Sequence, residues 1–307
     1  MSLPGRVRIV EVGPRDGLQN ETVAISVDDK AELIALLAAA GLSEIEAGSF
    51  VSHARVPQMA ATREVIARLE PALRERIDAL TPNLRGLEEA LACGVGGVAV
   101  FAAASQTFSR KNIGCSIEAS MERFAPVAER ARSEGLRMRG YVSCALGCPY
   151  EGAIAPRDVA RVARDLAALG CTEISLGDTI GVGAPAPARR LVAAVAQDVP
   201  LAQLAVHFHD TFGQALANIF ACLELGVASV DSSVAGLGGC PFAPGATGNV
   251  ATEDVVYMLE RSGIETGVDL SALSEAGDFI SARLGRANLS KAARALRARR
   301  ARKDEAE

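Results

Sequence analysis

The chain alternates eight times between a short apolar segment and an alanine-rich segment of helical periodicity. The apolar, β-branched segments predict strands, and they lie at residues 7–13, 44–49, 76–81, 97–103, 137–144, 173–178, 204–210 and 229–235. Helical spacing marks segments such as 28–41, 156–170 and 213–226. The last two end in Gly170 and Gly226, which is typical of helix C-caps. Eight strand–helix units across about 260 residues predict a (β/α)₈ barrel, the TIM-barrel architecture, whose usual size is about 250 residues.

A doubly wound open sheet is the alternative fold for the same alternation. Such a sheet ordinarily carries a G-x-G-x-x-G turn after its first strand, and "EVGPRDGLQNE" lacks this turn. The barrel is therefore the better prediction, with bounds of about 7–265. The remaining segment, about 266–300, predicts one or two extra helices over the barrel. We expect one domain across residues 1–307, since no interdomain linker is evident.

Composition narrows the class of partners. The chain is 49% hydrophobic and 22% charged, which indicates a globular protein, and its net charge of −5 does not favour nucleic acid as a partner. No apolar stretch reaches the 18 or so residues of a membrane span. The basic run near the end, "RALRARRARKDEAE", fits a solvated helix end better than an RNA- or membrane-binding arm. A homodimer or a higher homo-oligomer stays open.

Cysteine usage bears on the compartment. The seven cysteines are an odd number, and "MSLPGRVRIVEV" does not read as a secretory leader. We expect free thiols in a reducing, cytoplasmic compartment. Cys144 and Cys148 are four residues apart, but no second pair or nearby histidine completes a zinc site, so they are expected to be ordinary thiols.

Polar residues gather where the predicted strands end. In a TIM barrel the active site lies at the C-terminal ends of the strands. The residues at or just past those ends are Arg15, Asp16, Glu46, Asn83, Ser105, Ser143, Asp178, His207, His209 and Asn249. The interiors of the strands are expected to be apolar. One end of the barrel is thus the predicted site.

A histidine pair is the most informative sequence signal at that end of the barrel. Of three histidines in the chain, two form "HFH" at the end of the seventh predicted strand. Residues i and i+2 of a strand face the same side, so His207 and His209 can both point into the barrel mouth. Hydrogen-bonded packing is the alternative for a buried histidine, but the paired arrangement favours a metal or catalytic role. Asp16 and the amide oxygen of Asn249 would complete a mixed N/O set, which suits Mg²⁺ or Mn²⁺ better than a thiolate zinc site.

Two further features stay open on the residues alone. Arg15 could stabilise an oxyanion or enolate in a transition state, or form a salt bridge to a barrel carboxylate. Residues 233–254 place Cys240 among four glycines between 236 and 245. This run could be a flexible turn or a segment whose backbone approaches a ligand closely.

Seven motifs together resemble one family, that of 3-hydroxy-3-methylglutaryl-CoA lyase. The similarity runs from about residue 7 to 290, and the last motif is the most specific. "RDG" with "HxH" alone would indicate only the wider superfamily of metal-dependent lyases and Claisen-type synthases on TIM barrels. The motifs are "VEVGPRDGLQNE" (10–21), "SFVS" with "VPQMA" (49–60), "FSRKNI" (108–113), "GCPYEG" (147–152), "EISLGDTIGVG" (173–183), "VHFHDTFGQALAN" (206–218) and "SVAGLGGCPFAPGATGNVATED" (233–254).

The resemblance implies cleavage of 3-hydroxy-3-methylglutaryl-CoA into acetyl-CoA and acetoacetate, with a divalent metal as cofactor and an acyl-CoA as the small-molecule partner. It implies these roles: Asp16, His207, His209 and Asn249 as metal ligands, Arg15 as enolate stabiliser, Cys240 as the catalytic cysteine of a mobile loop, and Glu46 and Asp178 as supporting acidic residues. The chain departs from the family pattern at Thr22, Gln106, Gly114 and Phe242, none of which is a predicted ligand.

Three other functions remain as alternatives. The first is a lyase for a related branched 3-hydroxyacyl-CoA. The second is a Claisen-type synthase, although such enzymes generally continue into accessory domains and lack the "GLGGCP" cysteine loop. The third is a metal-binding barrel without turnover, which the combination of Arg15, Asp16 and Cys240 argues against.

Overall fold

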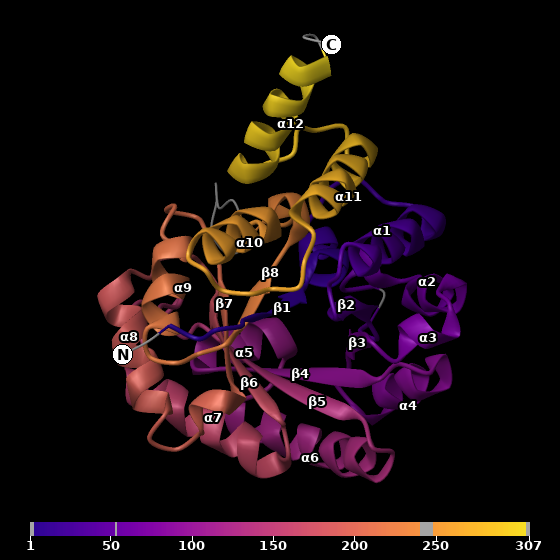
Figure 1. Ribbon diagram of the computed structural model, residues 1–307. Coiled ribbons are helices and arrows are strands. Elements are labelled where there is room, and N and C mark those ends of the chain that lie inside the picture. The colour runs from indigo at the N-terminus through magenta and orange to yellow at the C-terminus, as the bar shows by residue number, and fades with distance from the viewer. Residues whose placement is uncertain (1–2, 53, 240–247, 305–307) are drawn as a thin grey trace.

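Eight parallel strands close into a barrel in the computed structural model, which describes residues 3–52, 54–239 and 248–304. Each strand pairs with its neighbour in chain order, and β8 pairs with β1. The helices surround this barrel (Figure 1). The strands are β1 Arg8–Glu11, β2 Glu44–Ser49, β3 Ile77–Leu80, β4 Gly97–Ala103, β5 Arg137–Ser143, β6 Glu173–Asp178, β7 Leu204–Phe208 and β8 Ser229–Ser232. The predicted (β/α)₈ barrel is confirmed, and the open sheet is excluded.

The helices follow the strands around the outside of the barrel. They are α1 Val27–Ala39, α2 Thr62–Arg68, α3 Pro71–Arg74, α4 Leu84–Cys93, α5 Gln106–Ile113, α6 Ile117–Ser133, α7 Pro156–Leu169, α8 Pro185–Val195, α9 Ala215–Leu223, α10 Thr252–Arg261, α11 Leu270–Arg283 and α12 Lys291–Asp304. The three helices predicted above correspond to α1, α7 and α9.

Capping residues explain where several of these helices begin and end. Ser26 accepts a hydrogen bond from the Asp29 amide at 3.0 Å and so starts α1. Gly170 ends α7 with a φ of 111°, as predicted for a left-handed C-cap. The prediction for Gly226 was wrong, because α9 ends at Leu223 with Glu224 as its cap. Gly226 instead turns the chain toward β8, with a φ of 105°.

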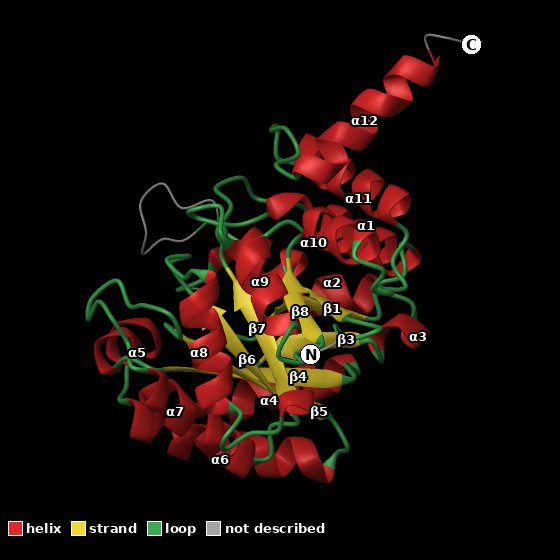
Figure 2. Ribbon diagram, turned by 60° about the vertical axis from the view of Figure 1, so that its left-hand side comes forward, coloured by secondary structure: helices red, strands yellow, loops and turns green. Residues whose placement is uncertain are grey.

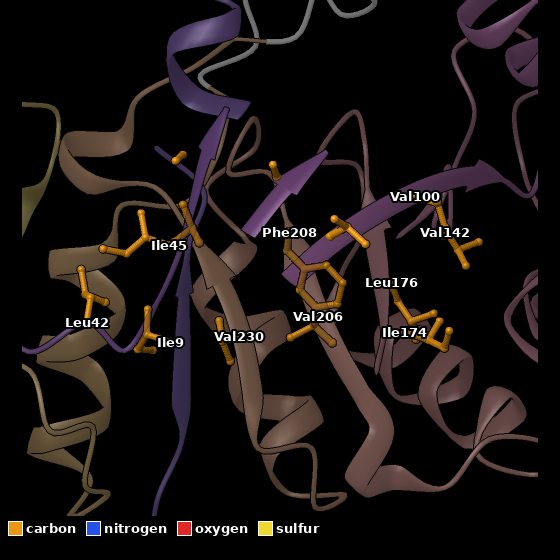
Figure 3. Close-up of a cluster of buried hydrophobic side chains, with 14 of the residues drawn as sticks. Ile9, Leu42, Ile45, Val100, Val142, Ile174, Leu176, Val206, Phe208 and Val230 are labelled. Atoms are coloured by element: carbon orange, nitrogen blue, oxygen red, sulfur yellow. The ribbon is translucent and has the colours of Figure 1, made fainter. Parts of the chain in front are cut away.

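Strand alternation separates an apolar outer layer from a charged interior. Ile174, Leu176, Val206 and Phe208 belong to the buried apolar cluster drawn in Figure 3. The intervening residues point inward, and they include charged groups, so the prediction of apolar strand interiors was wrong. The inward groups include Glu46, Asp78, Arg139, Glu173, Ser175 and Asp231, all buried. They are tolerated there because opposite charges pair, as Arg139 does with Glu173 at 2.6 Å.

The C-terminal segment forms two helices, α11 and α12, as the sequence predicted. α11 packs against α1, and α12 packs against α10. α12 then projects away from the barrel (Figure 2), and its Arg294, Arg297 and Arg299 are exposed. Among the described residues, none of the helices combines the length and apolar character needed to cross a membrane.

Candidate active site

A cavity of about 880 Å³ opens at the C-terminal end of the barrel. Arg15, Asp16, His207 and His209 line one wall of it. Val51, Leu80, Phe101, Phe108 and Ile113 make other parts of its wall apolar. The predicted end of the barrel therefore holds both a polar cluster and room for a substrate with an apolar portion.

A tight turn directly after β1 carries Arg15 and Asp16. Residues Gly13–Gly17 form a five-residue π-helical turn, and the buried Glu11 carboxylate fastens it by accepting the Gly13 amide at 2.8 Å. Glu11 also accepts the Val234 amide at 2.9 Å and the Thr252 hydroxyl at 2.6 Å. Burial raises the pKa of Glu11 to about 7, although these three hydrogen bonds act in the opposite direction. The turn is thereby tied to the segments that follow β8.

The candidate metal ligands converge on one oxygen. Oδ2 of Asp16 lies 3.8 Å from Nε2 of His207 and 3.9 Å from Nε2 of His209. These distances are too long for hydrogen bonds, while donor atoms of the three residues lie within 4.8 Å of one another. Nδ1 of His209 is buried and has no hydrogen-bond partner among the residues that the structure describes. Two imidazoles and a carboxylate that face one point without bonding each other fit a divalent cation with mixed N/O preference.

Asn249 lies beside this cluster, as predicted. A β-bridge joins it to His209, and its Nδ2 donates to Oδ2 of Asp16 at 2.8 Å and to the Leu237 carbonyl at 3.4 Å. The amide nitrogen therefore faces the carboxylate. Ligation through the Asn249 oxygen requires the amide to turn over, so its role as fourth ligand stays a prediction.

The surroundings shift the pKa values of the three residues in different directions. Burial would raise the pKa of Asp16, but Arg15 and the two histidines outweigh burial and hold that pKa well below its usual range. Burial, and then the neighbouring His207, lower the pKa of His209 to about 4. For His207 burial acts downward too, but the Asp231 hydrogen bond and the Asp16 charge raise its pKa overall. At neutral pH the site thus offers an ionised carboxylate and a neutral imidazole on His209.

Arg15 is buried between two carboxylates. Its Nε lies 2.6 Å from Oε2 of Glu46, and one terminal nitrogen lies 2.5 Å from Oδ1 of Asp16. Its charged form is stabilised, because these two carboxylates outweigh burial and raise its pKa. Arg15 therefore forms the salt bridge offered above as one interpretation, and it also lines the cavity. Its other role, stabilisation of an oxyanion or enolate, stays a prediction.

Two predicted acidic residues hold different positions. Glu46 faces inward and contacts Arg15, although it does not line the cavity. Asp178 follows Leu176 by two residues and so points to the outer side of the barrel, where it accepts the Gly183 amide at 2.8 Å and the Val182 amide at 3.2 Å. It thus fastens the loop after β6, from which Thr179 reaches the cavity wall.

The other predicted residues divide between lining and capping. Asn83 and Ser143 line the cavity. Ser105 caps α5 by accepting the Phe108 amide at 3.1 Å. Cys240 lies outside the described residues, while Gly239, immediately before it, reaches the cavity wall.

Three buried residues near the site were missed by sequence reasoning: Arg139, Tyr141 and Asp231. The Tyr141 hydroxyl donates to Oε1 of Glu46 at 2.9 Å, and Asp231 lies 3.3 Å from Nδ1 of His207. Arg139 contacts both Tyr141 and Asp231, each at 2.8 Å. The period-2 alternation within β5 and β8 was the available signal, since it places these side chains inside the barrel.

A closed TIM barrel with a carboxylate and two imidazoles beside a buried arginine defines a class, the metal-dependent TIM-barrel enzymes. Comparison with known proteins narrows the class. The family described as HMGL-like matches residues 6–280, and the chain belongs to this family of carbon–carbon lyases.

Two relatives named as lyases resemble the chain over nearly its whole length. A Pseudomonas aeruginosa protein named 3-hydroxy-3-isohexenylglutaryl-CoA/hydroxy-methylglutaryl-CoA lyase is 60% identical over 299 residues, covering 97% of this chain and 100% of the relative. The human mitochondrial hydroxymethylglutaryl-CoA lyase is 56% identical over 294 residues, covering 96% and 90%.

Solved structures share the fold of this chain. The crystal structure of hydroxymethylglutaryl-CoA lyase from P. aeruginosa matches with a TM-score of 0.94 at 60% identity, covering 97% of this chain and 100% of that one. An HMG-CoA lyase from Acinetobacter baumannii, solved with coenzyme A and 3-methylmalate, matches with a TM-score of 0.90 at 36% identity, covering 96% of each chain.

Proposed function

We propose that the protein is a hydroxymethylglutaryl-CoA lyase, which cleaves 3-hydroxy-3-methylglutaryl-CoA to acetyl-CoA and acetoacetate. The observation that carries the proposal is the convergence of Asp16, His207 and His209 beside Arg15 at one wall of the cavity. The names of the relatives at 56–60% identity support the same substrate.

The reaction needs three changes in the substrate. The 3-hydroxyl loses its proton, the C2–C3 bond breaks as C3 becomes the ketone of acetoacetate, and the electron pair passes into the thioester as an enolate. Protonation of that enolate at C2 gives acetyl-CoA. Asp16, His207, His209 and Asn249 would hold a divalent cation, Mg²⁺ or Mn²⁺, which when bound lowers the pKa of a hydroxyl and stabilises negative charge.

Arg15 is suited to the charge that develops during cleavage. A guanidinium has five N–H donors, and contacts with Glu46 and Asp16 engage three of the Arg15 nitrogens. Donors on the terminal nitrogens remain for an enolate oxygen in the cavity. Because the carboxylates hold the group in place before substrate binds, Arg15 would stabilise the oxyanion without reorganisation.

Cys240 is proposed as the proton donor to the enolate, because thiols transfer protons near neutral pH and Gly239, the residue before it, lines the cavity. Cys240→Ser should fold normally yet lose most turnover. Cys93→Ser and Cys171→Ser serve as controls, since both thiols are buried and burial raises the pKa of Cys171 to about 12. A fully active Cys240→Ser protein would exclude the thiol as donor.

The direct test is product analysis. Purified protein with Mg²⁺ and 3-hydroxy-3-methylglutaryl-CoA should release acetoacetate and acetyl-CoA in equal amounts. Incubation with acetyl-CoA and 2-oxo acids tests the Claisen-type synthase. Absence of free acetoacetate would favour the synthase, if condensation is seen, or the binding barrel, if it is not.

A second candidate is activity on a 3-hydroxyacyl-CoA with a longer branch at C3. Leu80, Phe101 and Val51 form an apolar wall in the cavity, and the P. aeruginosa relative is named for an isohexenyl substrate as well. Comparison of kcat/KM for the methyl and isohexenyl substrates measures this breadth. Phe101→Ala should change the ratio if that wall contacts the branch.

Three further properties belong to the same proposal. We propose a cytoplasmic location, supported by the free state of the six described cysteines and by a zebrafish relative named as cytoplasmic, while mammalian relatives are named as mitochondrial. Cell fractionation tests this location.

We also propose a homodimer or higher homo-oligomer, which is tested by sedimentation. Competition between Mg²⁺ and Mn²⁺ during turnover identifies the preferred metal.

A further inference from the structure

A buried chain of hydrogen bonds runs through the barrel interior and has a candidate metal ligand at each end. Each link lies between 2.5 and 3.3 Å. The two ends face each other, because Nε2 of His207 lies 3.8 Å from Oδ2 of Asp16. In order the chain is Asp16, Arg15, Glu46, Tyr141, Arg139, Asp231 and His207.

Asp231 is the link that touches the His207 ring. It is 1% exposed, and its Oδ2 accepts the Ser175 hydroxyl at 2.8 Å and faces Nδ1 of His207 at 3.3 Å. An ionised carboxylate can only accept hydrogen bonds. Nδ1 of His207 must therefore carry the proton in the neutral ring, which leaves Nε2, the nitrogen that faces Asp16, free to bind a cation.

Arg139 holds that carboxylate. It is 2% exposed, and its NH2 group donates to Oδ1 of Asp231 at 2.8 Å while Nε donates to Glu173 at 2.6 Å. Arginine offers donors only, and the shorter of its two contacts with Asp231 is the one to Oδ1, at 2.8 Å against 3.5 Å to Oδ2, so it orients the carboxylate with Oδ2 toward His207. Arg139 also donates to the Tyr141 hydroxyl at 2.8 Å, which leads through Glu46 to Arg15.

We propose that Asp231, held by Arg139, is a positioning residue that fixes the His207 tautomer required for metal binding. The geometry supports this role, since Arg139 donates to Oδ1 at 2.8 Å and approaches Oδ2 only at 3.5 Å, while Oδ2 is directed at the ring. The inference rests on the metal site of the proposed function. It assigns Asp231 no contact with substrate.

The substitution Asp231→Asn should reverse the tautomer of His207. Because Arg139 needs an acceptor, the new amide oxygen must take the place of Oδ1, and the amide nitrogen then faces Nδ1 of His207. A donor at that position stabilises the tautomer protonated at Nε2, which cannot bind a cation. A comparable Asp→Asn change in the serine-protease triad has its effect through the wrong tautomer.

The tautomer can be read directly by NMR of protein labelled with ¹⁵N-histidine. The chain has three histidines, so few imidazole signals occur, and a His207→Gln variant assigns those of His207. In metal-free wild-type protein above the pKa of His207, we expect a protonated Nδ1 and an unprotonated Nε2. The opposite tautomer in wild-type protein would overturn the inference even if no variant folds.

Metal affinity gives the second readout. Titration with Mn²⁺, followed by its EPR signal, should show a 10- to 100-fold loss in Asp231→Asn, as is usual for groups that orient metal ligands. Ser175→Ala is the matched control: it removes one hydrogen bond to the same Oδ2 and keeps the charge, so the tautomer should be retained and affinity should change little. Asp198→Asn, at an exposed position, controls for loss of a carboxylate.

The outcomes separate this inference from the proposed function. If Asp231→Asn binds Mn²⁺ as tightly as wild-type protein and keeps its tautomer, Asp231 does not position His207. If wild-type protein itself binds no Mn²⁺, the metal site fails, and the tautomer measurement alone then decides the role of Asp231.

Discussion

Nε and one terminal nitrogen of Arg15 both lie 2.6 Å from the same oxygen, Oε2 of Glu46. This contact fixes the plane of the guanidinium, while the other terminal nitrogen bonds Asp16. Arg15 is thus held by the buried Glu46 and the partly buried Asp16. These two contacts fix the orientation of its remaining N–H donors. The first prediction follows from this arrangement.

Arg15→Gln should lower kcat far more than it raises KM. Loss of one preorganised donor to a developing oxyanion typically costs roughly 10²–10³ in rate, whereas ground-state binding would appear in KM. Steady-state kinetics with 3-hydroxy-3-methylglutaryl-CoA measure the two constants. Arg157→Gln, at an exposed position on α7, is the control. A normal kcat with a raised KM would make Arg15 a binding group.

Tyr141→Phe should act on the same step through Glu46. The substitution removes the hydroxyl that donates to Glu46 at 2.9 Å and accepts from Arg139 at 2.8 Å, but keeps the ring. We expect kcat to fall about tenfold, in line with roughly 1.4 kcal/mol for the lost hydrogen bond to Glu46, which holds Arg15, with Mn²⁺ affinity retained. Tyr257→Phe, exposed on α10, should match wild type. Equal kcat in both variants would show that Tyr141 does not position Arg15.

Metal removal should abolish turnover. Treatment with EDTA should eliminate acetoacetate release, and Mg²⁺ or Mn²⁺ should restore it, because the cation is proposed to act on the reacting hydroxyl. His209→Ala should weaken Mn²⁺ binding, measured by calorimetry, since Nε2 of His209 lies 3.9 Å from Asp16 at the candidate site. Full activity of a verified metal-free sample would refute the cation requirement.

The barrel and one wall of its site follow from local pattern in the sequence. Strand alternation and the rule that sites lie at the C-terminal strand ends predicted that Asp16, His207 and His209 share one end of the barrel, where the structure brings them together. Both rules operate over a few residues. The same alternation could also have predicted which way Asp178 points. It has the parity of Leu176, which belongs to the outer apolar cluster, and so it faces the outside of the barrel.

The charged interior could not be predicted in this way. Arg139 and Asp231 are 92 positions apart, and only barrel closure brings β5 and β8 to opposite sides of one interior. In the sequence, each of these charged residues taken alone looks like an interruption of an apolar strand. Their pairing offsets the cost of burial, and that compensation becomes visible only when both partners are placed in three dimensions.

Glu253 allows a prediction about stability and pH. Its carboxylate is fully buried, accepts the Ala235 amide at 2.9 Å and accepts Nδ2 of Asn288 at 3.2 Å. Burial raises its pKa from 4.5 to about 8, and the nearby Glu11 acts in the same direction, against these hydrogen bonds. The folded protein therefore retains a proton on Glu253 at pH values where the unfolded chain has released it.

The stability that this proton provides is fully present below about pH 4.5 and is lost as the pH rises through about 8. Glu253→Gln is neutral at every pH, so the fall in the free energy of unfolding between those values should become shallower. Each pKa unit corresponds to about 1.4 kcal/mol, so the change in slope should be measurable by urea unfolding of metal-free protein at pH 5 and pH 8. Glu260→Gln, exposed at the end of α10, should retain the wild-type slope. An unchanged slope in Glu253→Gln would show that Glu253 is ionised in the folded protein across this range.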